Sequence, residues 1–207
     1  MDDNSVPAPV PANDINVPYP PSSIFPITIE RPLRLRPLWI GFLLAFIELL
    51  FLLLTHIFTG NDLLVGLCML FSGLAGIGAI VYYCMSIHRL IRVLRTQPDW
   101  SSEYTPAGVV WRQFIPLYNL VVLYQWTGDV ESYVDWRLGI TSKAGLWTFI
   151  GLMIGFAFAS FHQVVWVGYA IITGSLAFLY VPVRRALLVA PPADGAAPRY
   201  DGSLGLR

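Results

Sequence analysis

The sequence predicts an all-α integral membrane protein with four transmembrane helices that form two hairpins. Two features predict it: 56% of the 207 residues are hydrophobic while only 13% are charged, and the apolar residues gather in long windows. A helix needs about 20 apolar residues to cross a bilayer, because lipid offers its backbone no hydrogen-bond partners. Four windows meet or approach that length: residues 38–58, 63–87, 144–161 and 164–183. We expect one membrane domain over residues 30–189.

The link within each pair of windows is short, so each pair must turn back on itself as a hairpin. Asn61-Asp62 and His162-Gln163 mark the two tips. Lys and Arg favour the cytoplasmic side of a membrane, and neither tip carries one, so all 13 basic residues fall on the opposite side. We therefore expect a multi-pass protein of the cell (inner) membrane with both termini in the cytoplasm.

The two terminal segments have a different composition. Residues 1–29 hold seven of the sixteen prolines and few large apolar side chains, and residues 190–207 have the same character. Such segments can neither propagate a helix nor bury enough surface to offset the entropy of ordering. We expect two disordered tails. The proline-rich amino-terminal tail is either passive or a contact site for a protein partner.

Residues 106–138, between the hairpins, include a stretch apolar enough to suggest a fifth crossing. A crossing would place Arg112 and Asn119 near mid-membrane, where an arginine costs about 2.5 to 3.5 kcal/mol, and Pro116 would break the backbone ladder between them. We expect instead an amphipathic, proline-kinked segment that lies in the cytoplasmic interface or re-enters the membrane and returns. Arg112, Pro116 and Asn119 fall at helical spacing on one stripe, a candidate site for a lipid headgroup or a protein partner.

The amphipathic pattern continues from Leu117 to Leu138. One face carries the apolar residues Leu123, Trp126, Val130, Tyr133, Val134 and Leu138, and the other carries Gln125, Asp129, Ser132 and Asp135. A helix with this pattern buries one face and exposes the other. The pattern is typical of a helix on the membrane surface. We favour a linker that covers the cytoplasmic end of the helix bundle; the alternative makes Arg112 and Asn119 a site for a lipid headgroup or a partner.

Glu48 is the only acidic residue inside a predicted crossing, about ten residues or roughly 15 Å from its inner end. Counting equal depths along the other helices places Ser72, Thr173 and Ser175 at its level. A protonated Glu48 that hydrogen-bonds one of these hydroxyls would be structural. The alternative is an intramembrane site for a proton or a cation.

Small residues recur every four positions in the third window, at Gly151, Gly155 and Ala159. Helices in lipid gain little from burying apolar area, so small residues that allow close backbone approach carry much of their packing. We expect this stripe to pack inside one bundle, with a homo-oligomer contact as the alternative.

Other function classes lack their usual residues. The formal net charge is zero and no zinc-knuckle or helix-turn-helix pattern is present, so nucleic acid is not an expected partner. No H-E-x-x-H, G-x-S-x-G, phosphate-binding glycine loop or cysteine–histidine set occurs, so we expect no enzyme, cofactor or metal. The leading hypothesis is a non-enzymatic membrane protein that contacts proteins or lipids at the cytoplasmic face. The alternative is a small transporter or channel subunit that uses Glu48.

Three short motifs carry a resemblance to a known group of proteins. They are His88-Arg89-Leu-Ile-Arg92, Tyr104-Thr-Pro106-Ala-Gly108 and Phe114-Ile-Pro116-Leu-Tyr-Asn119. In this order the chain resembles small bacterial multi-pass membrane proteins catalogued as domains of unknown function, over residues 38–185. It departs from them at Val122-Leu123-Tyr124, where such proteins often show a Trp/Arg-Pro-Tyr step. The resemblance implies two helical hairpins joined by this segment, and it implies no activity.

Overall fold

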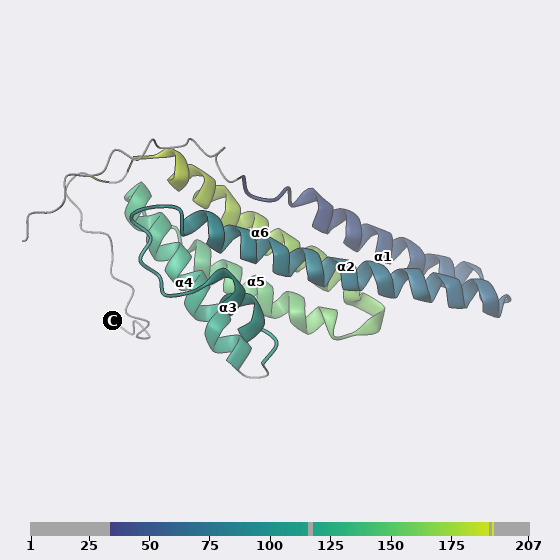
Figure 1. Cartoon of the computed structure of the whole chain (residues 1–207). Helices are drawn as coiled ribbons and strands as arrows, with labels where there is room; N and C mark the ends of the chain where they lie inside the picture. Colours follow the sequence, from purple (N-terminus) through teal and green to yellow (C-terminus); the bar gives the residue numbers. More distant parts are fainter. Residues whose placement is uncertain (1–33, 116–117, 191, 193–207) are drawn as a thin grey trace, which may run out of the picture. The chain divides into compact units, whose positions relative to one another are not determined.

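The computed structural model describes residues 34–115, 118–190 and 192, and in this part of the chain all regular structure is helical, with no strand (Figure 1). The order is α1 (Trp39–Ile57), α2 (Asp62–Leu94), α3 (Pro106–Arg112), α4 (Tyr118–Leu138), α5 (Ala144–Ala159), the 3-10 turn η1 (His162–Val164) and α6 (Val165–Leu188). The expectations for the tail 1–29, for Pro116 and for nearly all of 190–207 fall outside the described residues.

Three of these helices are long and apolar enough to cross a membrane: α1 with 19 residues, α2 with 33 and α6 with 24. The apolar α5 is shorter, with 16 residues. The expectation of an all-helical chain with membrane-length helices is thus confirmed. The largest difference from the predicted windows is α2, which runs to Leu94 instead of ending at residue 87. It continues because Ile87, Leu90, Ile91 and Leu94 form a stripe that is fully buried.

Local sequence signals set the starts of α2 and α3. The Asn61 side chain accepts a hydrogen bond from the Leu64 N–H over 3.2 Å, and the Thr105 hydroxyl accepts one from the Gly108 N–H over 3.0 Å. Both satisfy N–H groups that have no partner inside the helix. Pro106 occupies the first turn of α3, where its missing N–H costs nothing.

α5 begins without a cap from its own N-cap residue, Lys143, whose backbone is left-handed with φ of 51°. Glu131 of α4 supplies the cap, because its carboxylate accepts the Leu146 N–H over 2.8 Å. Asp135 of α4 holds the preceding turn by accepting from the Ser142 N–H at 2.9 Å and the Ser142 hydroxyl at 2.6 Å. Two acidic residues of α4 therefore fix where α5 starts.

α1 packs along α2, α5 packs along α6, and α6 also contacts α1 (Figure 1). Small residues bring α5 and α6 together: a Cβ on Gly155 would lie 3.0 Å from the Gly168 carbonyl oxygen, and one on Gly168 would collide with the Ala159 backbone. A Cβ on Gly151 would collide with the Ser175 hydroxyl. The stripe of Gly151, Gly155 and Ala159 is thus in contact with α6 of the same chain.

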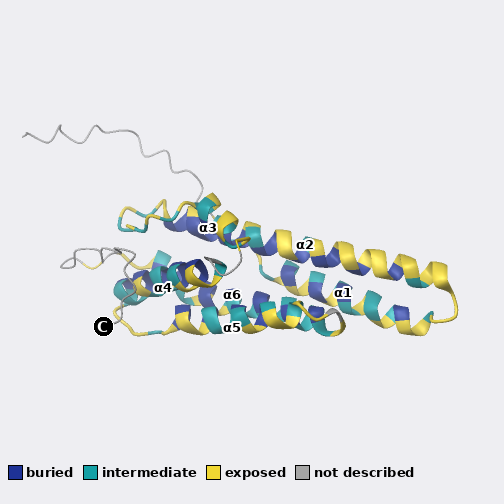
Figure 2. Ribbon diagram, turned by 90° about the horizontal axis from the view of Figure 1, so that it is seen from below, coloured by how far each residue is buried: buried dark blue, intermediate teal, exposed yellow. Residues whose placement is uncertain are grey.

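The two hairpins are staggered along their length. A Cβ on Gly41, near the start of α1, would lie 2.7 Å from the Thr173 hydroxyl of α6. One turn earlier on α6, Tyr169 lies beside Gly76 of α2 and Glu48 of α1. The turn between α5 and α6 therefore ends short of the turn between α1 and α2, as both ribbon views show (Figures 1 and 2).

The apolar face of α4 packs against the rest of the protein. Its fully buried residues are Val122, Leu123, Trp126, Val130, Tyr133 and Val134. They belong to the same core as the buried residues of α2 and α6, and α4 lies on α5 and α6 (Figure 2). The apolar face of α4 thus lies on protein and not on the membrane surface. This agrees with the favoured interpretation of a linker that covers the bundle.

A buried ion pair ties three segments together. Arg137 of α4 lies 2.6 Å from Asp99, which follows α2, and the two side chains are 6% and 9% exposed. The same guanidinium donates to the Tyr133 hydroxyl at 2.6 Å and to the Val189 carbonyl, beyond α6, at 3.0 Å. Burial raises the pKa of Tyr133 to about 12, so its hydroxyl keeps its proton. This cluster connects the ends of α2, α4 and α6.

Candidate functional site

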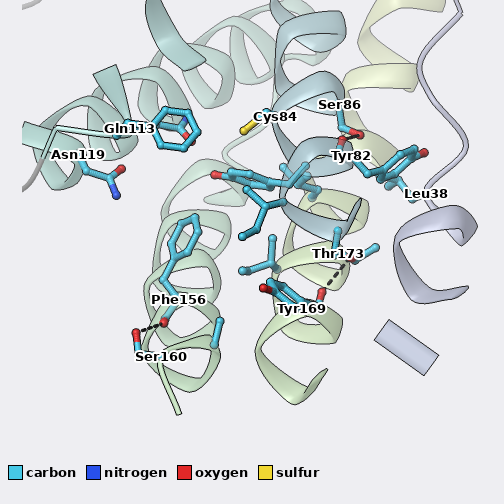
Figure 3. Close-up of a pocket in the computed structure, with 17 residues that line it drawn as sticks. Leu38, Tyr82, Cys84, Ser86, Gln113, Asn119, Phe156, Ser160, Tyr169 and Thr173 are labelled. Carbon is cyan, nitrogen blue, oxygen red and sulfur yellow. Dashed lines mark hydrogen bonds between the residues drawn. The ribbon is translucent and has the colours of Figure 1, made fainter. Parts of the chain in front are cut away.

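A cavity of about 350 Å³ lies where α2, α5 and α6 meet the segment between α3 and α4 (Figure 3). Leu38, just before α1, also lines it. Gln113 and Asn119 lie across the cavity from Leu38 and Tyr82, with Phe156 and Tyr169 on a further side (Figure 3). The lining is mostly apolar, and it is made by residues from five separate parts of the sequence.

Most polar groups in the lining already have partners. Hydroxyls that donate to a backbone carbonyl are those of Tyr82, Ser86, Ser160 and Thr173. Three other polar atoms are buried and have no hydrogen-bond partner among the described residues: the Tyr83 hydroxyl, Gln113 Nε2 and Asn119 Oδ1. A buried polar group left in this state costs about 1 to 3 kcal/mol. All three belong to residues that line one cavity, so a molecule bound there would have polar groups to pair with.

The fold holds these three side chains from two sides. Tyr83 sits on α2, and its ring packs edge-on against Phe156 of α5 with ring centroids 5.5 Å apart. Gln113 is the C-cap residue of α3. Asn119 is in the first turn of α4, where its N–H donates to the Ile115 carbonyl over 2.9 Å. The end of α3 and the start of α4 thus present two amide side chains to the cavity, and α2 presents one phenol.

The cavity opens toward an apolar part of the protein surface. Two lining residues, Ile80 and Phe114, are themselves 42% and 59% exposed. Their neighbours Trp111 and Ile115 are also exposed, and the rings of Trp111 and Phe114 lie 6.1 Å apart. An apolar rim of this kind suits contact with lipid and gives an apolar chain a way into the cavity.

Glu48 lies next to this cavity. It is only 4% exposed, and within the described part of the chain its Oε2 atom has no hydrogen-bond partner. A Cβ on Gly76 would lie 3.1 Å from Glu48 Oε1 and 3.4 Å from the Tyr169 hydroxyl, so glycine at this position makes room for both. Tyr169 also lines the cavity. One tyrosine therefore separates the buried acid from the cavity.

The partners expected for Glu48 lie elsewhere. Thr173 and Ser175 each donate at 2.8 Å to a carbonyl oxygen one turn earlier in α6, and Ser72 is buried on α2. Among the described residues none of these hydroxyls hydrogen-bonds Glu48. Glu48 lies instead beside Gly76 and the Tyr169 hydroxyl.

The predicted stripe of Arg112, Pro116 and Asn119 is only partly brought together. Arg112 is exposed at the end of α3, Asn119 is half-buried and lines the cavity, and Pro116 is outside the described residues. The structure groups Asn119 with Gln113 and Tyr83 instead. Gln113 had a detectable signal, a polar residue in an apolar stretch, whereas nothing in the sequence distinguished Tyr83 from other helical tyrosines.

No protein-family model, curated protein or solved structure matches the chain. Within the described ranges, no group of three or more His, Cys, Asp or Glu side chains is placed to hold a metal ion. The cavity and Glu48 are the features of the described residues that bear on function.

Proposed function

We propose that the chain is a non-enzymatic multi-pass membrane protein that binds an amphipathic, lipid-like molecule in this cavity. It would cross the cell (inner) membrane four times with both termini in the cytoplasm. The observation that carries the proposal is the combination of apolar walls with three buried polar atoms that lack partners. Ligand cavities have this character, since apolar walls supply affinity and a few polar groups fix orientation.

The depth of the cavity supports a site at the cytoplasmic leaflet. Leu38 and Tyr82 line it, and the Tyr82 hydroxyl donates to the Pro37 carbonyl just before α1. Arg34 and Arg36 lie in the same short segment, and basic residues that precede a crossing favour the cytoplasmic side. The three unpaired polar atoms would then lie near the level at which lipid head groups begin.

The short length of α5 affects how the second hairpin can cross the membrane. The 16 residues of α5 cover about 24 Å, less than the roughly 30 Å of a hydrocarbon core. A short apolar hairpin is accommodated by local thinning of the bilayer, at modest cost.

Membrane-impermeant labelling of single cysteines tests the proposed topology. We expect labelling from outside at Asn61→Cys and Gln163→Cys but not at Asp129→Cys, and outside labelling at position 129 would overturn it.

The binding proposal is tested by purifying the full chain in mild detergent and identifying co-purified amphipaths by mass spectrometry. Asn119→Leu should retain less of the ligand by about fivefold, the worth of one hydrogen bond. Gln163→Leu, at an exposed tip position, is the matched control and should retain as much as the unmodified protein. Equal retention by all three proteins, or no amphipath in any of them, would contradict the proposal.

A second candidate is a small transporter or channel subunit that uses Glu48. It is favoured by the unpaired carboxylate oxygen of Glu48 and by the closeness of Tyr169 to both Glu48 and the cavity. Intramembrane acids often mark ion or proton pathways. Flux of protons or monovalent cations into liposomes should fall to background with Glu48→Gln if this function is correct. An unchanged flux, or none with the unmodified protein, would assign Glu48 a structural role.

A further inference from the structure

We propose that the cavity takes an uncharged amphipath whose head group carries a hydroxyl, and that it excludes anionic and cationic lipids. The inference rests on the proposed function and names the class of ligand for the same site. Three properties of the lining carry it: the absence of charge, the mixture of unpaired donors and acceptors, and the size of the space.

The described residues that line the cavity include no Asp, Glu, Lys, Arg or His. The guanidinium of Arg36 lies 6.0 Å from the centroid of the Tyr82 ring, but Arg36 is not part of the lining. An ion that leaves water for such a place loses its hydration without gaining a counter-charge, which is strongly unfavourable. A charged head group is therefore a poor fit.

The unpaired atoms point to the same conclusion through hydrogen bonding. Gln113 Nε2 is a donor, Asn119 Oδ1 is an acceptor, and the Tyr83 hydroxyl can act as either. An ionised phosphate only accepts, so it would satisfy Gln113 and place negative charge against the Asn119 oxygen. An ammonium group only donates, so it would bind the Asn119 oxygen and leave Gln113 Nε2 without an acceptor. A hydroxyl both donates and accepts, so it can satisfy the two amides together.

The size of the cavity limits how much of the ligand it encloses. At about 30 Å³ for a water-sized group, 350 Å³ holds on the order of a dozen non-hydrogen atoms. That is enough for a small head group and the first carbons of a chain. The remaining chain would leave past the exposed Ile80 and Phe114 into the surrounding lipid. Long-chain alcohols and monoacylglycerols have this form, whereas a two-chain phospholipid is too large.

Cys84 supplies a reporter for occupancy, because it lines the cavity and is a free thiol. The other cysteine of the described chain, Cys68, is buried on α2 and is removed by Cys68→Ala. The full chain is placed in phosphatidylcholine nanodiscs, and the rate of Cys84 alkylation by N-ethylmaleimide is measured. Three additives share one tail and differ in head charge: oleyl alcohol, oleyl phosphate and oleylamine, which is protonated to an ammonium at neutral pH.

We expect oleyl alcohol to slow alkylation by about fivefold or more, and the two charged additives to slow it by less than about twofold. Tyr83→Phe, Gln113→Leu and Asn119→Leu should each weaken the protection by oleyl alcohol. Gln163→Leu should leave it unchanged. Tyr83→Phe removes only a hydroxyl, so it reports on the site even if a leucine variant folds poorly.

The outcomes separate the two proposals. Equal protection by all three additives would overturn the selectivity while leaving amphipath binding intact. Protection by a charged additive alone would also overturn it and assign the opposite class of head group. No protection by any additive, together with no co-purified amphipath, would overturn the proposed function as well.

Discussion

The interface between α5 and α6 and one face of α2 differ in how closely another helix approaches their glycines. In α5 and α6, Gly155 and Gly168 lie so close that a side chain on either would meet backbone of the other helix. In α2, Gly66 and Gly73 have nothing within 4 Å of where a Cβ would stand. α1 and α2 contact each other through larger groups, such as Phe51 and Phe71, stacked 5.2 Å apart. A glycine in a membrane helix therefore indicates close packing only where another backbone reaches it.

Breaking the buried ion pair between Arg137 and Asp99, which connects the two hairpins, should have the largest effect on stability. Arg137→Met leaves Asp99 buried without its partner, and breaking a buried pair in this way costs about 3 to 5 kcal/mol. We expect a loss of this size in the free energy of unfolding, measured by denaturant titration in detergent. The double variant Asp99→Leu with Arg137→Met is the control, and it should recover most of the loss because no charge remains unpaired. A loss as large in the double variant as in the single one would show that the charge plays no part.

The contrast between the glycines gives the next largest effect. Gly168→Ala forces α6 away from the backbone of α5, and overpacking of this kind costs about 1 to 3 kcal/mol. Gly73→Ala adds a methyl group in open space, so it should be neutral or stabilise α2 by up to about 1 kcal/mol. Thermal unfolding of both variants measures the difference. Equal effects of the two substitutions would show that the closeness of another backbone does not decide their cost.

The smallest expected effect on stability is that of the charge of Asp129, on α4 between the two hairpins. Burial raises the pKa of Asp129, and the hydrogen bond donated by the Ser102 hydroxyl at 2.7 Å partly opposes this. A raised pKa in the folded state favours the neutral form, so the contribution of Asp129 to stability is present at acidic pH and is lost as pH rises through that pKa.

Asp129→Asn keeps an acceptor for Ser102 and removes the charge. We therefore expect it to raise the melting temperature slightly at neutral pH and to match the unmodified protein at acidic pH. Thermal unfolding at two pH values tests this. A variant that is less stable at neutral pH than the unmodified protein would reverse the sign.

The positions of the long helices could be predicted from the sequence, but the register between them could not. Long apolar windows located α1, α2 and α6, since the length and composition of a membrane helix are local properties. The partners of Glu48 were missed by one helical turn. Equal-depth counting selected Ser72 of α2 and Thr173 of α6, whereas Gly76 and Tyr169 lie at that level. On α6 the shift follows from the stagger of the two hairpins.

The cavity could not be read from the chain for a related reason. Asn119 was a candidate because a polar residue is unusual in an apolar stretch, but its grouping with Gln113 and Tyr83 depends on how three helices meet. The direction of the apolar face of α4 was also ambiguous. Lipid and a protein core are equally apolar, so residues such as Trp126 and Val130 fit either environment by pattern alone.

The length of α2 carries one more consequence. At 1.5 Å per residue its 33 residues extend about 50 Å, roughly 20 Å beyond what a hydrocarbon core can enclose. α3 packs against α2. A change in the tilt of α2 in a thicker or thinner bilayer would therefore move α3 with it.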